Sequence, residues 1–273
     1  MTKATSAIPE GFHSVTPYLI VDGAKPFLQF ITVAFGATER FTMAGPDGII
    51  RHAESRIGDS ILEFAQSGPT WSAMPGGLHY YVPDVDEVYS RALQAGGASL
   101  NEPTDRDYGD REAGIRDPAG NLWFIATQIG QKNYRPDTLR DLNTYFSVED
   151  AGRFLQFIET AFQGQLLESE TTNSGSIVHA KIRVGDTTVE VGEGRPPWGP
   201  RKVAHHYYVE NCDAVFARGL VNGCRELQPM ANQFYGDRSG SLLDAWGNHW
   251  YIASHTEDLT PEQMAERAAA AGR

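Results

Sequence analysis

The sequence has few cysteines and no long apolar run, and each shortage excludes a class of protein. Its 273 residues contain two cysteines, Cys212 and Cys224, on either side of a predicted helix. About 12 helical residues separate them by roughly 18 Å, which is too far for a disulfide, so we expect structural thiols. No apolar run approaches the ~20 residues of a transmembrane helix, so we predict no membrane partner.

Basic residues are also scarce. Lys and Arg number 23 against 35 Asp and Glu, which gives a formal net charge of -12. Nucleic acids are bound by clustered basic side chains, so this balance argues against a nucleic-acid partner. The sequence contains no nucleophile elbow, phosphate-binding loop or reactive-thiol motif. Residues 1–14 carry no hydrophobic signal core, and the expected location is cytoplasmic.

An internal duplication is the main positive feature of the sequence. Tyr108–Arg111 recurs as Tyr235–Arg238, and His52-Ala53 recurs as His179-Ala180, each 127 residues later. Every matching pair has the same offset, so the second half copies the first with no net insertion. A period this long indicates a duplicated domain, because solenoid units have about 20–50 residues. Duplicated domains usually pack about a pseudo-two-fold axis, so we expect two related clefts.

Each half contains the pattern strand, helix, three strands, twice. Apolar residues with helical spacing over Ala24 to Phe35 end at Gly36, for example, and the second helix of each half follows a Tyr-Tyr-Val strand. The sequence therefore predicts an α+β fold of four βαβββ modules, in two domains related by pseudo-two-fold symmetry. The predicted boundaries are domain 1 at 14–128, a polar linker at 129–140, domain 2 at 141–256, and a helical tail at 257–273 that begins with a capping box. The oligomeric state is left open.

Two predicted hairpins place polar side chains on one face of each sheet. Gly-Asp turns at 58–59 and 185–186 set Glu54 opposite Glu63 and leave apolar side chains under the helices. The polar faces carry His52, Glu54, Arg56 and Glu63 in the first half, and His179, Lys181, Arg183, Thr188 and Glu190 in the second. Such a face is typical of a wet cavity or a site for a polar ligand. The alternative is a solvated face with cross-strand ion pairs such as Lys181–Glu190.

These features together resemble the vicinal oxygen chelate superfamily, which contains glyoxalases, bleomycin-resistance proteins and extradiol dioxygenases. Besides the four modules, the matching motifs are Pro46-Asp47-Gly48 before His52-Ala53-Glu54, Ile57-Gly58-Asp59-Ser60, and Asp117-Pro118 with Gly120-Asn121. The likeness covers roughly residues 14–128 and 141–255. It is greatest to an uncharacterised two-domain branch with His-Ala-Glu and Tyr-Gly-Asp-Arg motifs. These motifs are specific for the fold and weak for the reaction.

The resemblance also carries the metal-ligand positions of the superfamily's metalloenzymes onto this chain. Their fourth-strand glutamate falls on Glu63 and Glu190. The three other positions fall on Thr16 and Asn143, on Gly77 and Ala204, and on Phe124 and Tyr251. A catalytic metal takes about three protein ligands, so we predict no metal and no cofactor. The alternative is a divalent metal at a shifted site in the second half, formed by His179, Glu190, His206 and His249.

Three functions are open on this basis, and whether the protein is an enzyme is open with them. We favour a metal-free protein that binds a small organic molecule in its sheet cavity, as drug-sequestering members of the superfamily do. The second is a metal-dependent isomerase, lyase or dioxygenase that uses the shifted site. The third is a metal-free acid–base enzyme that uses Glu63 or Glu190 beside a histidine. The predicted ligand-binding residues are His52, Glu54, Glu63, His79, Phe124, Tyr108, Arg111, His179, Glu190, His206, His249, Tyr251, Tyr235 and Arg238.

The repeated Tyr-Gly-Asp-Arg segments have two interpretations. They are expected within polar loops, Thr104 to Ala113 and Ala231 to Gly240. In the first interpretation each is a turn, in which Gly adopts a positive φ and the Asp-Arg pair anchors the loop by a charge-assisted hydrogen bond. In the second, each tyrosine is a lid over a cavity, held by the arginine, or the arginine meets an anionic ligand.

Overall fold

The computed structural model describes residues 2–196 and 198–270 and confirms the predicted α+β fold of four βαβββ modules. Module 1 comprises β2 (Val15–Val21), α1 (Ala24–Phe35), β3 (Thr38–Ala44), β4 (Ile50–Ile57) and β5 (Ser60–Gln66). Module 2 comprises β6 (Gly77–Tyr81), α2 (Val85–Gln94), β7 (Ala98–Asp105), β8 (Asp110–Arg116) and β9 (Leu122–Gln128). Module 3 comprises β10 (Leu142–Val148), α3 (Ala151–Phe162), β11 (Gln165–Thr171), β12 (Ile177–Val184) and β13 (Thr187–Glu193). Module 4 comprises β14 (Ala204–Tyr208), α4 (Cys212–Val221), β15 (Arg225–Asn232), β16 (Asp237–Leu243) and β17 (His249–His255).

The terminal segments lie outside the modules. β1 (Thr2–Lys3) pairs with β18 (Glu257–Asp258), and α5 (Pro261–Ala270) follows. The predicted capping box is present, because Thr260 Oγ1 accepts from the Gln263 amide while Gln263 Oε1 accepts from the Thr260 amide. The last residues of the predicted tail, 271–273, lie outside the described residues. None of the described helices is long and apolar enough to cross a membrane.

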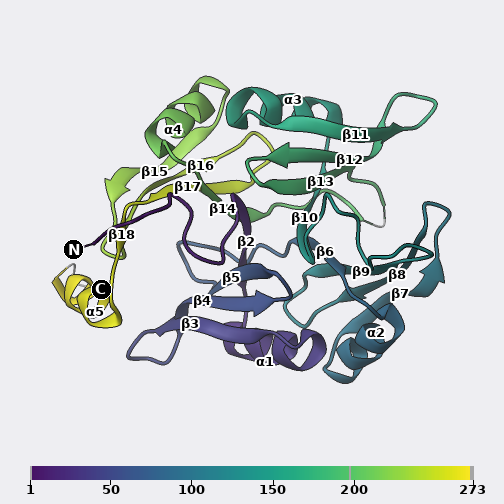
Figure 1. The fold of residues 1–273 in the computed structure, drawn as a ribbon, viewed down its shortest axis with the longest axis horizontal. Helices are drawn as coiled ribbons and strands as arrows, with labels where there is room; N and C mark the ends of the chain where they lie inside the picture. Colours follow the sequence, from purple (N-terminus) through teal and green to yellow (C-terminus); the bar gives the residue numbers. More distant parts are fainter. Residues whose placement is uncertain (1, 197, 271–273) are drawn as a thin grey trace.

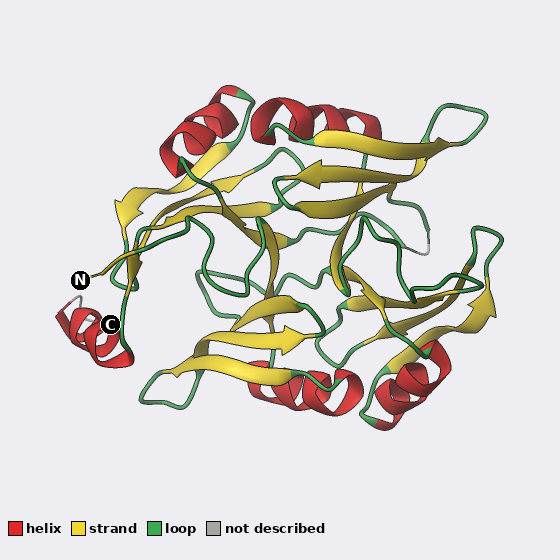
Figure 2. Ribbon diagram, in the orientation of Figure 1, coloured by secondary structure: helices red, strands yellow, loops and turns green. Residues whose placement is uncertain are grey.

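The helices form where the sequence predicts them, for local reasons. In α1 the residues Phe27, Ile31 and Ala34 lie on one buried stripe, and Gly36 ends the helix with a φ of 67°. At the start of α2, the Asp84 side chain accepts a hydrogen bond from the Glu87 amide. Helices α1 and α2 lie on one side of the molecule and α3 and α4 on the opposite side, with the strands between them (Figures 1 and 2).

Each of the two eight-stranded sheets takes one module from each half of the chain. The strand orders are β11-β12-β13-β10-β6-β9-β8-β7 and β15-β16-β17-β14-β2-β5-β4-β3. The joins are antiparallel pairs, β10 with β6 and β14 with β2. Figure 1 shows each sheet curling away from the centre, with concave faces that open to opposite sides. Each predicted domain therefore has its own helices and core but shares both sheets, and its independence as a folding unit stays a prediction.

The two hairpin registers are as predicted, and one predicted ion pair is wrong. Glu54 pairs with Glu63, and Lys181 pairs with Glu190. The Lys181 ammonium nevertheless lies 2.7 Å from a carboxylate oxygen of Glu168 on the neighbouring strand, and no ion pair joins it to Glu190 among the described residues. The reason is that histidines occupy both carboxylate oxygens of Glu190.

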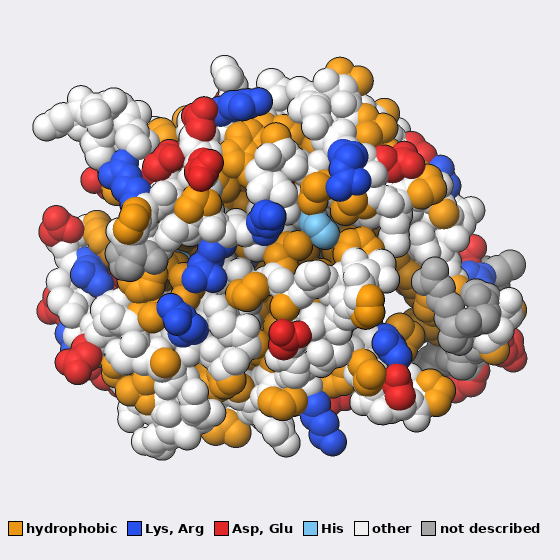
Figure 3. All heavy atoms as spheres, turned by 180° about the vertical axis from the view of Figure 1, so that it is seen from behind, with side chains coloured by type: hydrophobic (Ala, Val, Ile, Leu, Met, Phe, Trp, Pro, Cys, Tyr) orange, Lys and Arg blue, Asp and Glu red, His pale blue; other side chains and the backbone are white. Residues whose placement is uncertain are grey.

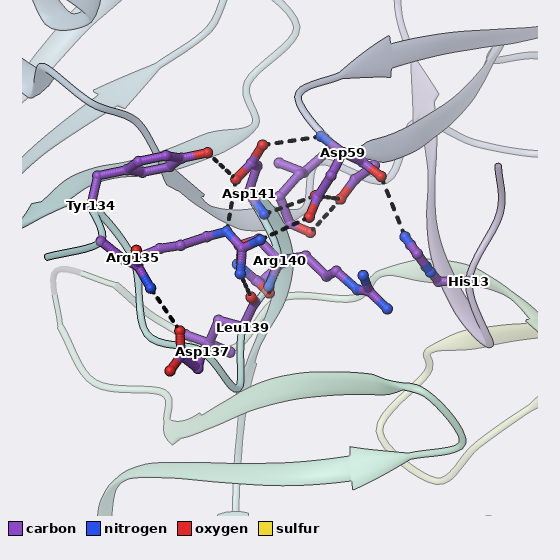
Figure 4. Close-up of polar contacts among 12 residues, drawn as sticks. His13, Asp59, Tyr134, Arg135, Asp137, Leu139, Arg140 and Asp141 are labelled. Carbon is purple, nitrogen blue, oxygen red and sulfur yellow. Dashed lines mark hydrogen bonds and ion pairs between the residues drawn. The ribbon is translucent and has the colours of Figure 1, made fainter.

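The hairpin turns lock the two sheets together. The Asp59 amide donates to Asp141 Oδ2 and the Asp141 amide donates to Asp59 Oδ1, both at 3.0 Å (Figure 4). The duplicated turn repeats this exchange, because the Ser14 amide donates to Asp186 Oδ1 and the Asp186 amide donates to Ser14 Oγ. Arg135 bonds Asp141 and lies 3.2 Å from Asp59, so the linker contributes to the lock. Charge-assisted bonds of this kind are about twice as strong as neutral ones.

Candidate ligand-binding site

A buried glutamate lies at the floor of each concave sheet face. Glu63 of β5 and Glu190 of β13 are each 1% exposed. We call the two surfaces the Glu63 face and the Glu190 face. Their side chains alternate along the strands with core residues such as Leu62 and Phe64, which lie under α1. A carboxylate buried this deeply needs a charged or hydrogen-bonding partner.

The partner of each glutamate is a histidine from the other half of the chain. His206 Nδ1 lies 2.9 and 2.8 Å from the two carboxylate oxygens of Glu63. His79 Nδ1 lies 2.8 Å from Glu190 Oε2. Because the joins between modules place β14 beside β2 and β6 beside β10, these contacts cross from one half to the other.

A second histidine, from the same half as the glutamate, lies on its other side. His179 Nε2 is 3.0 Å from Glu190 Oε1. His52 Nε2 is 3.7 Å from Glu63 Oε1 and 3.3 Å from Glu54 Oε1. Each face therefore carries a His–Glu–His set, built from duplicated positions.

The surroundings of two of these histidines, His79 and His206, favour the charged form of the ring. Burial lowers the pKa of His79, but the nearby Glu190 carboxylate outweighs this and raises it above its ordinary value. For His206, burial likewise lowers the pKa and the Glu63 carboxylate raises it, and the net effect is again a rise. Burial also disfavours the ionised form of Glu190, yet His79 and His179 together hold its pKa below its usual range. On the Glu190 face, the shifts of His79 and Glu190 thus both favour an ion pair between the two side chains.

Aromatic rings surround both sets. On the Glu63 face, the Tyr18 ring lies 5.3 Å from that of Tyr251 and 5.7 Å from that of His52. On the Glu190 face, Phe124 lies 5.4 Å from Tyr145, and Tyr145 stacks on His179. Phe124 and Tyr251 both line a concave face, but the grouping by halves expected from the sequence is wrong, because Phe124 lies with Glu190 and Tyr251 with Glu63. Flat apolar walls around a few polar groups suit a planar organic ligand.

His79 leaves one nitrogen for a further partner. Its Nδ1 meets Glu190, while its Nε2 is buried and has no hydrogen-bond partner among the described residues. The side chain as a whole is 7% exposed. The raised pKa favours the protonated ring, in which Nε2 carries a hydrogen that it can donate. A buried donor without a partner costs free energy, so this atom marks where a ligand or water belongs.

The two faces differ at one duplicated position. Glu54 on the Glu63 face corresponds to Lys181 on the Glu190 face. His52, Glu54 and Glu63 consequently offer ligand atoms within 4.8 Å of one another, the one such group of three or more among the described residues. The Glu63 face is therefore the more acidic of the two, and the Glu190 face carries an additional cation.

The alternative of a shifted metal site in the second half does not match the structure. It needs His179, Glu190, His206 and His249 in one place, but the first two lie in one sheet and the other two in the other. His249 lies at an end of the Glu63 face, where its ring is 5.5 Å from Trp71. The group that does approach metal-ligand spacing comes from the first half of the chain.

The Tyr-Gly-Asp-Arg segments form tight hairpin turns rather than long loops, because β7 ends at Asp105 and β8 begins at Asp110. Arg111 binds Asp86 at the start of α2 through two nitrogens, at 2.6 and 2.8 Å. Arg238 binds Asp213 of α4 in the same way. Both arginines therefore point to the helix side, which favours the turn interpretation for them.

The two tyrosines of these segments behave differently from each other. Tyr108 is 62% exposed and donates to Glu112. Tyr235 is half-buried, with its hydroxyl 3.3 Å from Ser239 Oγ. It also lies close enough to Tyr251 to contribute to the pKa of that residue, which burial, Glu63 and Tyr235 together raise. Of the two predicted lids, Tyr108 is turned outward, whereas Tyr235 is close enough to raise the pKa values of Tyr18 and Tyr251 on the Glu63 face.

Several residues of the faces were missed from the sequence. The buried aspartates of the repeated motif, Asp110 and Asp237, accept hydrogen bonds from the hydroxyls of Tyr81 and Tyr208 inside the faces. Tyr134 and Leu139 of the predicted polar linker pack on Tyr81, just as Ile8 and Phe12 pack on Tyr208.

Trp71 and Trp198 lie against Tyr251 and Phe124. The sequence did contain a signal for the two aspartates and the two tryptophans, because the members of each pair are 127 residues apart. Each tryptophan also lies two residues after a proline.

The comparison with known protein families agrees with this architecture. Residues 11–125 match the model of the Glyoxalase/Bleomycin resistance protein/Dioxygenase superfamily. The chain belongs to this superfamily. The resemblance drawn from the sequence is thereby confirmed. Superfamily relatives include an uncharacterised protein of Mycobacterium bovis, 30% identical over 131 residues, which span 44% of this chain and 86% of that protein. An uncharacterised protein of Mycobacterium tuberculosis is likewise 30% identical over 131 residues, 44% of this chain and 77% of the relative.

Solved superfamily structures share the tandem arrangement. Glyoxalase I from Zea mays superposes with a TM-score of 0.67 at 16% identity, covering 94% of this chain and 96% of that one. A putative dioxygenase from Bacillus subtilis superposes with a TM-score of 0.59 at 15% identity, covering 92% and 89%. At such low identity these likenesses establish the fold alone.

The superfamily's usual metal does not fit the residues of this chain. Along the Glu63 face, the ligand positions carried over by the resemblance hold Thr16, Ala204 and Tyr251 besides Glu63. Both oxygens of Glu63 already meet His206. The Glu190 face has Asn143, Gly77 and Phe124 at the same positions. One carboxylate does not replace the three protein ligands of a catalytic site.

Proposed function

We propose that this protein binds small planar organic molecules on its concave sheet faces, without a metal at the superfamily's usual position. The observation that carries the proposal is the Nε2 atom of His79, a buried ring nitrogen that has no partner among the described residues and whose protonated, donor form the raised pKa favours. Phe124 and Tyr145 provide apolar surface on the same face. A flat ligand with a hydrogen-bond acceptor, such as an aromatic carbonyl compound, satisfies the donor and covers the rings.

The charges predict different ligands for the two faces. Lys181 adds a cation to the Glu190 face, and Glu54 adds an anion to the Glu63 face. We therefore expect acceptor-bearing neutral ligands to bind the Glu190 face and cationic aromatic ligands to bind the Glu63 face, where Tyr18 and Tyr251 offer ring surfaces.

The structure supports a metal-free acid–base enzyme less well than it supports ligand binding. A general base needs a pKa near the working pH, but His79 and His179 overcome burial and lower the pKa of Glu190. Glu190 is therefore a weak base, and its main role is to orient and charge His79. Under this view a catalytic step would use His79 as the proton donor.

A ligand screen tests the proposal. Neutral aromatic ketones and cationic aromatic amines are tested by thermal shift, and the hits are titrated calorimetrically. His79→Gln should weaken binding of the neutral hits about 5- to 150-fold, the effect of about 1–3 kcal/mol for one polar contact. His206→Gln, the duplicated position, is the matched control and should leave them unchanged. No hit in either class, or hits that both variants bind as the wild type does, would contradict the proposal.

A second candidate function is divalent-cation binding by His52, Glu54 and Glu63, which the 4.8 Å grouping of their ligand atoms favours. Imidazole and carboxylate together suit zinc or manganese. The duplication supplies a reciprocal test, in which Glu54→Lys copies the other face and Lys181→Glu gives that face the same three residue types. Elemental analysis and calorimetry with zinc should show binding that Glu54→Lys removes. Equal zinc binding by wild type and Glu54→Lys would exclude this site.

A further inference from the structure

Two arginines that pair with no carboxylate in the described part of the chain lie at one end of the sheet that carries Glu190. Arg201 lies in the segment between β13 and β14, and Arg116 is the last residue of β8. Neither forms an ion pair with a described residue, although the chain has 35 acidic residues for 23 basic ones. Arg111 and Arg238, by contrast, are each held by an aspartate.

The backbone brings these two residues together. The Arg201 amide donates to the Ser147 carbonyl at the end of β10, and one of its terminal nitrogens lies 3.5 Å from the Pro75 carbonyl. Arg116 pairs with Leu122 of β9, whose amide donates to the carbonyl of Gly76, the residue after Pro75. Three strand ends therefore converge on one place. Burial lowers the pKa of Arg201, and the positive charge of Arg116 lowers it further.

Arg201 also has an unsatisfied donor. Its Nε is buried and has no hydrogen-bond partner among the described residues. The contact of its terminal nitrogen with Pro75, at 3.5 Å, is at the long limit for a hydrogen bond. A guanidinium presents five donors in a planar fork, which matches the oxygens of a carboxylate or a phosphate. Arg116, which forms no ion pair with a described residue, adds a second positive charge close to the Arg201 guanidinium.

The duplicated position shows that the fold does not require these charges. Met74 and Leu243 occupy the positions that correspond to Arg201 and Arg116. The Met74 amide donates to the Ile20 carbonyl, which repeats the bond from Arg201 to Ser147. The same backbone is thus built once with two apolar side chains and once with two arginines.

We propose that Arg116 and Arg201 form an oxyanion-binding site that takes the phosphate or carboxylate group of a small anion. The site is separate from the His–Glu–His sets and goes beyond the function proposed for them. The surface drawn in Figure 3 has several Lys and Arg side chains across its middle, so the acidic composition of the chain does not exclude anions from every face.

The duplication also supplies the variants that test this site. Arg201→Met and Arg116→Leu copy the duplicated position, whose backbone accepts those side chains. Lys25→Met, on the exposed side of α1, changes the same charge elsewhere and is the matched control. Circular dichroism and urea unfolding establish that each variant is folded before its binding is measured.

Inorganic phosphate and acetate are titrated calorimetrically, at an ionic strength held constant with chloride. We expect at least one of the two anions to bind the wild type and Lys25→Met equally, and each arginine variant at least 10-fold more weakly. Binding of phosphate alone or of acetate alone supports the site and identifies the acid group. Equal binding by all four proteins, or no binding beyond that of chloride, overturns the proposal.

Discussion

Replacing His206 by Phe should strongly destabilise the protein, because it leaves Glu63 charged in a buried site. Glu63 is 1% exposed, and both its oxygens meet His206 Nδ1. The nearest other histidine nitrogen, Nε2 of His52, is 3.7 Å away. Removing one partner of a buried ion pair costs about 3–5 kcal/mol. At about 2–4 °C per kcal/mol for a chain of this size, the melting temperature should fall by about 6–20 °C.

The matched control removes the whole pair. The double variant Glu63→Leu/His206→Phe leaves no buried charge, so it should lie within about 1 kcal/mol of the wild type or above it. Urea unfolding followed by tryptophan fluorescence measures all three proteins. A loss below about 1 kcal/mol in His206→Phe, or a double variant no more stable than the single one, would show that Glu63 is not held by this histidine.

The same proteins test the pH dependence. Glu63 outweighs burial and raises the pKa of His206 above its ordinary 6.5. A raised histidine pKa gives stability that is fully present below the unfolded-state pKa and is lost as pH rises through the folded-state pKa. The advantage of the wild type over the double variant should therefore be larger at pH 6 than at pH 9. An advantage that grows with pH would refute the raised pKa.

Three further changes test other parts of the structure. Asp141→Ala removes the buried acceptor of the hairpin lock and should cost about 1–3 kcal/mol in urea unfolding, more than Ser14→Ala at the duplicated position. Gly185→Ala should cost more than about 1 kcal/mol, because φ is 61° and the added Cβ meets the Ser14 side chain; a thermal melt that matches the wild type would contradict the turn geometry. Arg238→Ala breaks the exposed pair with Asp213 and should lower the melting temperature slightly, while calorimetric affinity for any ligand found in the screen stays unchanged. A large loss of affinity would restore the lid interpretation.

Local features of the sequence were sufficient to predict the modules, the hairpins and the faces. The Gly-Asp turn at 58–59 fixes the register of β4 against β5, because a two-residue turn leaves one pairing. Once that register is set, period-two alternation places His52 and Glu63 on one face and Phe64 on the other. The constant 127-residue offset then transfers the same assignment to His179 and Glu190.

The neighbours of each module were decided by the tertiary structure alone. Period-two alternation says which face a side chain takes, but it does not say which strand lies alongside. β14 carries the same pattern whether it joins β2 or β10, and from the sequence His206 is grouped with Glu190 only because both lie in the second half. The pairing of β14 with β2 instead places His206 against Glu63, and this long-range contact rules out the alternative metal site in the second half. The sequence thus determined what each half contains, and the hydrogen bonding between strands of different halves, β14 with β2 and β6 with β10, determined which groups meet.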